Sequence, residues 1–325
     1  LERSVLDEPL LGVLISYLSP NASLESLSMT AHGLLPISVM LTALAVILAF
    51  GAAGFWNEGA IAALGSSLSS AFLGRTSAGR LDTDQLNLGF FYIIIALIIG
   101  AGRVKNIWLA LMLCVAAAAV THLFHWWWPK PILNWFYLLG LVWLTYCFSR
   151  SLTRTALLGV VYLALISTLN FGPSVYVSDF TATITSFGQM KLPNTFDAIA
   201  ELEVLSAGEF LSALMGNIWL GGLAILGIAG WVCVSPVFAV IFIPAICLAA
   251  MNTVFGNRVV FFAAPVFWFG LAWLALTSSR YVVCRLIQGN VTTLSTGFAG
   301  VQAFLAFVML TTTYFVSFNP LSKPY

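Results

Sequence analysis

The feature that most constrains this chain is a series of apolar runs, several of them seventeen residues or longer. Residues 86–102 read LNLGFFYIIIALIIGAG, and residues 258–276 read RVVFFAAPVFWFGLAWLAL. As α-helices, runs of this length cross a hydrocarbon core of about 30 Å. Neither run alternates apolar and polar residues, which excludes the strands of a lipid-facing barrel. The composition, with 60% apolar and 8% charged residues, also lies outside the range of soluble domains.

These runs predict an all-α fold, a polytopic transmembrane helical bundle of about ten helices. The predicted spans lie near residues 34–55, 58–74, 86–102, 107–125, 132–149, 155–171, 216–234, 235–252, 258–277 and 297–317. The segments 1–30, 75–85 and 172–215 then become external loops, and the last is long enough to be functional. We expect one transmembrane domain over residues 1–325.

Charge is distributed unequally between the two sides of this predicted bundle. Alternating the spans gives one side a single acid, Glu58, and six bases: Arg103, Lys105, Arg150, Arg154, Arg280 and Arg285. Positive charge marks that side as cytoplasmic. The external side receives eleven of the twelve acidic residues, so we expect the chemistry there. The net charge of +1 gives no reason to expect a nucleic-acid partner.

One external segment holds alternating acids beside two arginines. Asp82 and Asp84 form a D-x-D sequence close to Arg75 and Arg80. Two carboxylates in this pattern can bind one hard cation such as Mg²⁺ or Mn²⁺. An alternative is an ion-paired helix end, in which the acids only neutralise the arginines. The pattern alone leaves both interpretations open.

Two further external segments bring charge to a membrane edge. Glu201 lies in the long loop with Glu203 and Glu209, and Arg258 opens the apolar run at 258–276. A charge at the bilayer centre costs about 2.5–3.5 kcal/mol on insertion scales, so charges beside spans need a reason. The structural alternatives are a solvated loop acid and an arginine that reaches the lipid headgroups.

In their order and wording, these segments resemble the oligosaccharyltransferase family represented by eukaryotic STT3 and bacterial PglB. The family's second external loop reads N-R-T-x-x-G-x-x-D-T-D, and GRTSAGRLDTD spans Gly74 to Asp84 here. Aromatic residues followed by proline at a helix end resemble residues 126–129, WWWP. The family's T-I-x-E motif is similar to residues 198–201, AIAE, with Glu209 and Phe210 also in register. Its G-x-R-F-x-x-x-x-x-P pattern resembles GNRVVFFAAP, which contains Arg258 and Pro265.

The resemblance implies a multi-span glycosyltransferase fold and a specific reaction. The enzyme would move a glycan from a polyprenyl-pyrophosphate carrier to the asparagine amide of Asn-x-Ser/Thr sequons. The family's metal ligands correspond to Asp82 and Glu201, which would hold Mn²⁺ or Mg²⁺. Carried over to matching positions, the catalytic residues would be Asp82, Glu201 and Asp84, and the substrate-binding residues Arg258, Arg75 and Ile199.

The resemblance also implies partners and a location. The partners are the lipid-linked oligosaccharide donor, an acceptor polypeptide and membrane lipids. The location is a bacterial or archaeal cell membrane, with the active site on the external, periplasmic side. The family's first D-x-D and its C-terminal external domain with a W-W-D motif have no counterpart here, so we expect this polypeptide alone to be incomplete as an enzyme. A separate chain carrying the external domain is one way of completing it.

Three alternatives to this function stay open at the level of sequence. One is a glycosyltransferase that uses a single sugar on a polyprenyl phosphate, which the order of D-T-D, Glu201 and Arg258 disfavours. Another is a lipid-linked sugar flippase or transporter, for which broken helices in repeated halves would be typical. The third is a non-catalytic membrane scaffold derived from the enzyme.

Overall fold

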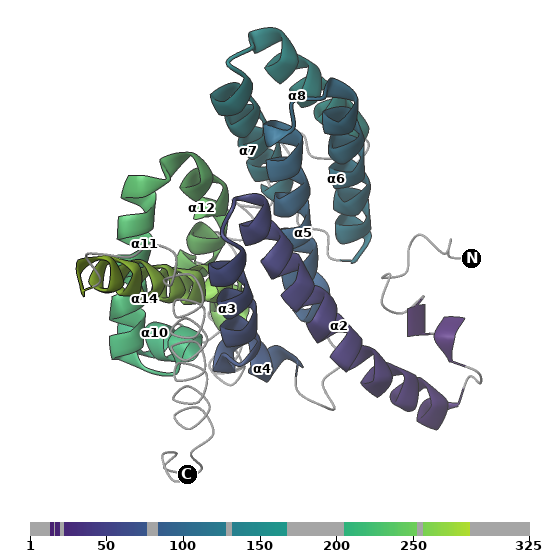
Figure 1. Cartoon of the computed structure of the whole chain (residues 1–325). Helices are drawn as coiled ribbons and strands as arrows, with labels where there is room; N and C mark the ends of the chain where they lie inside the picture. Colours follow the sequence, from purple (N-terminus) through teal and green to yellow (C-terminus); the bar gives the residue numbers. More distant parts are fainter. Residues whose placement is uncertain are drawn as a thin grey trace, which may run out of the picture. The chain divides into compact units, whose positions relative to one another are not determined.

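The computed structural model describes residues 14–15, 17–19, 23–76, 84–127, 132–167, 205–251 and 256–286. These residues are almost entirely helical, and no β-strand occurs among them. The chain divides into two compact units (Figure 1). Unit 1 comprises residues 1–54 and 75–200, and unit 2 comprises residues 55–74 and 201–325.

Unit 1 is built around one buried helix, α5. Its helices are α2 (Leu24–Ala52), α5 (Asp84–Arg103), α6 (Ile107–Trp127), α7 (Ile132–Ser149) and α8 (Leu152–Ile166). Helix α5 packs against α2, α6 and α7, and 67% of its apolar segment is buried. Leu88, Phe91 and Ile98 of α5 are completely buried. Burial on several faces explains why α5 is apolar all round rather than amphipathic.

Unit 2 is built around α14. It contains α3 (Trp56–Ser67), most of α4 (Ser70–Thr76), α10 (Ala207–Met215), α11 (Ile218–Val234), α12 (Pro236–Ala250), the 3₁₀ helix η3 (Gly256–Ala263) and α14 (Ala264–Leu286). Helix α14 packs mainly on α11 and α3, and the apolar segment Val259–Tyr281, which runs from η3 into α14, is 83% buried. Pro265, the second residue of α14, has the fixed φ that suits a first helical turn.

Glycines let α11 and α14 cross with their backbones in contact. A Cβ atom added to Gly227 of α11 would lie 1.9 Å from the carbonyl oxygen of Gly270 in α14. A Cβ atom added to Gly270 would lie 2.5 Å from the carbonyl oxygen of Ala224. Neither position accepts a side chain unless the helices separate. Small residues at such crossings are a usual means of packing helices in membranes.

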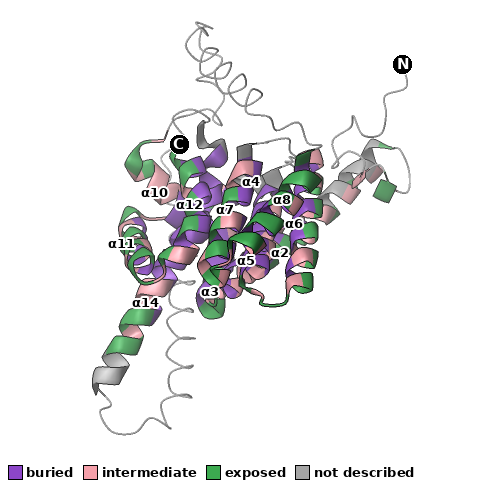
Figure 2. Cartoon of the chain, turned by 90° about the horizontal axis from the view of Figure 1, so that it is seen from above, coloured by how far each residue is buried: buried purple, intermediate pink, exposed green. Residues whose placement is uncertain are grey.

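The helices confirm the predicted all-α transmembrane fold. Among the described residues, four helical segments are long and apolar enough to cross a membrane, and a fifth span results if the bent pair α10–α11 counts as one. Shorter apolar helices of 10–17 residues correspond to the spans predicted near 132–149, 155–171 and 235–252. Large apolar side chains are exposed in both units, including Trp108, Leu163 and Leu226. Figure 2 shows exposed segments in green along many of the helices. The chain is therefore an integral membrane protein.

Three boundaries differ from the sequence prediction. Helix α2 begins at Leu24, within the segment expected to be external loop, because Ser23 caps it by accepting a hydrogen bond from the Ser26 amide. The long loop contains a helix of its own, α10. The span predicted at 58–74 is two helices, α3 and α4. The span predicted at 297–317 lies outside the described residues, and the single domain over 1–325 stays a prediction.

Serine side chains explain the break between α3 and α4. The hydroxyls of Ser66 and Ser67 both donate to the Ala63 carbonyl, at 3.1 and 2.8 Å. The Ser69 hydroxyl donates to the Ser66 carbonyl and accepts from the amide of Phe72 at 3.3 Å, so it closes one helix and caps the next. Such local hydrogen bonds compete with a continuous helix.

Candidate functional site

The D-x-D segment leads directly into the central helix of unit 1. Asp84 is the first residue of α5, and Asp82 and Asp84's side chain lie outside the described part of the chain. Two turns into α5, Phe90 stacks on Phe124 of α6 with ring centroids 5.5 Å apart. Its ring also lies 5.9 Å from that of Trp127, the last residue of α6. The aromatic motif at 126–129 therefore begins at a helix end, as predicted, and packs near the start of α5.

In unit 2, α10 joins two elements that carry other predicted residues. The hydroxyl of Ser70, the first residue of α4, donates to the Ala213 carbonyl of α10 at 3.1 Å. The indole Nε1 of Trp268 in α14 donates to the Leu214 carbonyl at 3.1 Å. Phe210 of α10 packs edge-on against Phe267 of α14, with ring centroids 6.0 Å apart. The end of the long loop is therefore fixed to both α4 and α14.

Glu209 of α10 has a structural role. Its carboxylate accepts a hydrogen bond of 2.9 Å from the Ser206 amide, and the Ser206 hydroxyl accepts one of 3.4 Å from the Glu209 amide. This reciprocal pair is a capping box, which satisfies two amides at the start of a helix. The hydrogen bonds from Ser206 lower the pKa of the Glu209 carboxyl below 4.5. Such a cap fixes where the long loop ends and α10 begins.

Arg258 occurs in η3, immediately before the most buried helix of unit 2. The five residues that follow Arg258 are buried, and Phe261 and Phe262 stack with ring centroids 4.6 Å apart. The buried residues that follow Arg258 therefore fix the backbone to which its guanidinium is attached. The side chain of Arg258 itself lies outside the described residues.

The structure brings some of the predicted site elements together and leaves others undescribed. Within unit 2, α10 carries Glu209 and contacts the other two elements. It contacts α4, which leads to Arg75, and η3, which contains Arg258. Glu201 and Ile199 lie outside the described residues, as do Asp82 and the side chains of Arg75 and Asp84. Among the side chains that are described, no three of His, Cys, Asp or Glu gather closely enough to hold a metal ion.

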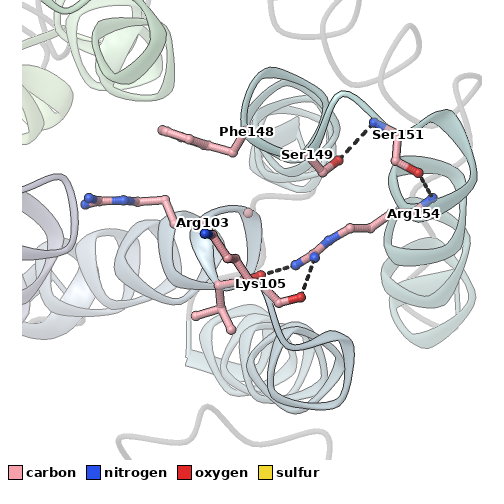
Figure 3. Close-up of a pocket in the computed structure, with 8 residues that line it drawn as sticks. Arg103, Lys105, Phe148, Ser149, Ser151 and Arg154 are labelled. Carbon is pink, nitrogen blue, oxygen red and sulfur yellow. Dashed lines mark hydrogen bonds between the residues drawn. The ribbon is translucent and has the colours of Figure 1, made fainter.

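A basic pocket in unit 1 is a feature that sequence reasoning did not identify. We call it the basic pocket; its volume is about 310 Å³, and its lining includes Arg103, Lys105, Phe148, Ser149, Ser151 and Arg154. Figure 3 shows Arg154 extending from α8 to the turn that carries Lys105. In the sequence, the bases Arg103, Lys105 and Arg154 served only to assign the sides of the membrane. The signal that could have found the pocket is their occurrence at neighbouring turns without any acid.

Comparison with known proteins supports the fold rather than a sequence family. No protein-family model matches the chain, and no curated protein matches its sequence. The helices have the fold of the transmembrane part of an oligosaccharyltransferase, as solved structures show. The predicted multi-span glycosyltransferase architecture is thereby confirmed.

Three of the similar structures are of oligosaccharyltransferase AglB from the archaeon Archaeoglobus fulgidus. The apo form superposes with a TM-score of 0.60 at 16% identity, over 95% of this chain and 46% of that chain. A form tethered by a disulfide bond to an acceptor peptide with an NVT sequon gives 0.60 at 14% identity. A complex with an inhibitory peptide and a dolichol-phosphate gives 0.58 at 15% identity. The chain thus spans less than half of the length of these enzymes.

Proposed function

We propose that this chain is the transmembrane catalytic part of an oligosaccharyltransferase, a glycosyltransferase that performs protein N-glycosylation. The donor is a glycan on a polyprenyl-pyrophosphate carrier, and the acceptor is the asparagine amide of an Asn-x-Ser/Thr sequon. The proposal rests on the shared fold and on the place of the motifs in it. D-x-D ends at the first residue of α5, and the Arg258 segment precedes α14, so each motif adjoins the most buried apolar segment of its unit.

The chemistry of this transfer explains the residue types. Asp82 and Glu201 would bind Mn²⁺ or Mg²⁺, since carboxylate oxygens suit these cations. When bound, such an ion would supply positive charge that favours departure of the pyrophosphate. Glu201 would also accept a hydrogen bond from the acceptor amide, whose nitrogen is otherwise a poor nucleophile. Asp84 would support the two acids.

Arginine is suited to the leaving group. Its planar guanidinium can donate two parallel hydrogen bonds to a phosphate, and Arg258 would do so with the carrier pyrophosphate. Arg75 and Ile199 would contact the substrates. The neighbouring structures hold an acceptor peptide with an NVT sequon in one case and a dolichol-phosphate in another, which are ligands of the proposed classes.

The proposed location follows from charge. The six bases assigned to one side of the predicted bundle place that side in the cytoplasm, and the site then faces the external, periplasmic side of a bacterial or archaeal membrane. Within unit 2, Arg280 and Glu58 form an ion pair at 3.6 Å, in agreement with their assignment to one side.

The direct test is a transfer assay with the complete gene product in membranes. A fluorescent peptide containing Asn-Val-Thr and a polyprenyl-pyrophosphate glycan should yield a glycopeptide with Mn²⁺ and none with a chelator. The variants Asp82→Asn, Glu201→Gln and Arg258→Gln should each lose activity by about 10²–10³-fold, the usual cost of removing one group that stabilises transition-state charge. Glu203→Gln, an acid of the same loop outside the motif, is the matched control and should stay active.

The outcomes separate the alternatives. Transfer from a polyprenyl-phosphate monosugar alone would indicate the single-sugar enzyme. Movement of the lipid-linked glycan across vesicles without peptide modification would indicate a flippase. If the folded protein shows neither activity, the non-catalytic membrane scaffold would be the remaining alternative. Any of these results contradicts the proposed function.

A further inference from the structure

Helices α5 and α7 of unit 1 lie side by side (Figure 1). The ring centroids of Phe91 in α5 and Tyr137 in α7 lie 6.0 Å apart. Further along both helices, a Cβ atom added to Gly102 would lie 2.9 Å from the Cβ atom of Leu144. Since the residue numbers of both helices increase from the first contact to the second, α5 and α7 are parallel. The start of α7 is therefore level with the D-x-D end of α5.

Buried polar side chains occupy this interface near its D-x-D end. Asn134 and Tyr137 are three residues apart and share one face of α7, and their side chains are 4% and 2% exposed. On α5, Asn87 is completely buried and lies one turn before Phe91, on the face that meets Tyr137. We call Asn87, Asn134 and Tyr137 the polar cluster.

Two atoms of the polar cluster have no hydrogen-bond partner in the described part of the chain. They are the amide Nδ2 of Asn134 and the hydroxyl oxygen of Tyr137. A buried donor that stays unpaired destabilises the fold, and most buried polar groups have a partner. Lipid outside a helical bundle supplies no hydrogen bonds, so the partner must come from the interior.

Other buried hydroxyls of unit 1 show why the polar cluster differs. Tyr162 is completely buried, but its hydroxyl oxygen lies 2.9 Å from Oγ1 of Thr121 in a direct hydrogen bond. The hydroxyl of Thr145 in α7 is also unpaired in the described structure. A threonine can, however, donate to a carbonyl of its own helix after rotation about χ1. The hydroxyl of Tyr137 lies at the end of a rigid ring and has no such choice.

Size and position indicate water as the partner of the polar cluster. The near-complete burial of Asn134 and Tyr137 leaves no opening for a larger ligand. They are the third and sixth residues of α7, so they lie roughly 3 and 8 Å along the helix from its first residue. The path from the membrane surface is short. A buried water needs two to four polar partners, and the Asn87 amide, which contains both donors and an acceptor, can be the third.

We infer that the polar cluster binds an ordered water molecule between α5 and α7. The water accepts a hydrogen bond from Nδ2 of Asn134, pairs with the hydroxyl of Tyr137 and reaches the amide of Asn87. It joins the start of α7 to the first turn of α5, which begins at Asp84. Long side chains on a helix lean toward its N-terminus, which is the direction of Asn134 from Tyr137.

The direct test is X-ray hydroxyl-radical labelling of the complete protein in nanodiscs, followed by mass spectrometry. The radicals form from water, so they oxidise a buried side chain only where a water molecule lies against it. Tyr137 should be labelled at least about fivefold faster than Tyr162, which is equally buried but is paired directly with Thr121. None of these measurements requires transfer activity.

Two variants locate the water. Asn134→Leu replaces the amide by an apolar side chain of similar size, so the labelling of Tyr137 should fall to the rate of Tyr162. Thr145→Val is the matched control, because it removes another unpaired hydroxyl from the same helix, about three turns further along. In this variant the labelling of Tyr137 should stay unchanged.

A stability measurement gives a second, independent sign. If water satisfies the hydroxyl, Tyr137→Phe should lower the ratio of folded to unfolded protein about fivefold in mixed micelles, because a hydrogen bond is lost. If the hydroxyl is unpaired, the same variant should be neutral or more stable. Tyr146→Phe, at a position of α7 that is 41% exposed, is the control and should change the ratio less than about twofold.

Three results would overturn the inference. Protection of Tyr137 equal to that of Tyr162 would show that the interface is dry. A neutral or stabilising Tyr137→Phe would show that the hydroxyl has no partner to lose. Equal loss of labelling in Thr145→Val and Asn134→Leu would indicate diffuse hydration of unit 1 instead of a defined site.

Discussion

The α11–α14 crossing of unit 2 and the α5–α6 turn of unit 1 are held by different means. In unit 2, α11 and α14 touch through glycines, and the added atom at Gly227 would meet backbone within 1.9 Å. In unit 1, side chains bind the backbone of neighbouring helices, as Arg154 does at the Val104 and Lys105 carbonyls. Lipid gives helices little hydrophobic reason to associate, so close packing and hydrogen bonds must do so. The difference teaches that the α11–α14 crossing depends on the volume of its residues, whereas the α5–α6 turn depends on hydrogen-bond donors and acceptors.

The largest effect on stability is expected from breaking the glycine contact between α11 and α14. Gly227→Ala should destabilise unit 2 by about 3 kcal/mol, the upper part of the range for overpacking, because the obstructing atoms are backbone. The measurement is unfolding in mixed micelles under increasing denaturing detergent. Gly222→Ala, on the same helix with open space around the added atom, should be neutral or slightly stabilising. Equal behaviour of the two variants would contradict the account of unit 2.

The next effect concerns unit 1. Arg154→Lys keeps the charge but loses the planar pair of donors, and we expect about 2 kcal/mol of destabilisation, as for hydrogen bonds from a charged group. Hydrogen exchange should accelerate in the α5–α6 turn before it does in α11. Arg150→Lys, which alters only a base lying over the Tyr146 ring, should leave exchange in that turn unchanged. A uniform increase across both units would show that the turn is not the element held by Arg154.

A smaller effect tests the ion pair of unit 2. Arg280→Gln leaves Glu58, whose side chain is only 6% exposed, without its cation at 3.6 Å. Because the Arg280 side chain is 49% exposed, water screens the interaction, and we expect about 1 kcal/mol. A double-mutant cycle with Glu58→Gln measures the coupling directly. Zero coupling would place this pair among the surface contacts that contribute nothing to stability.

The smallest effect is a titration at the start of α10. The lowered pKa of Glu209 means that its cap stabilises α10 above about pH 4.5, and that this contribution is lost as the pH falls through the lowered value. An NMR titration of the Glu209 carboxyl should give a midpoint below 4.5. In Ser206→Ala the midpoint should rise toward the ordinary value, because the hydroxyl cap is gone. An unchanged midpoint would mean that Ser206 does not set the titration.

Hydropathy predicted most helices of the described residues, because the lipid solvent requires long apolar segments. It could not predict where one segment breaks, since the break between α3 and α4 depends on which carbonyls the hydroxyls of Ser66, Ser67 and Ser69 bind. It assigned Glu58 to the same side as Arg280, but it gave no sign that Glu58 is buried in the first turn of α3 beside that arginine. Partners distant in sequence decide such details.

For the candidate site, the sequence supplied motif order and the structure supplied part of the arrangement. The apolar run put Arg258 at the start of a buried segment, where the structure has η3 followed by α14. The resemblance put the aromatic motif at a helix end, where α6 ends at Trp127. The roles of Asp82, Ile199 and Glu201 stay predictions. Hydropathy also gave no sign that Ser70 and Trp268 bind successive carbonyls of α10, because hydrogen bonds to backbone leave no residue pattern.

The attachment of α10 determines how the long loop can be exchanged between proteins of this fold. Its first turn is closed by Ser206, and its last residues are bound by Ser70 and Trp268, so residues 206–215 belong mechanically to the bundle rather than to the loop. A chimera that grafts a foreign loop should therefore place its C-terminal junction before Ser206. A junction inside α10 would interrupt the helix whose hydrogen bonds attach the grafted segment to α4 and α14.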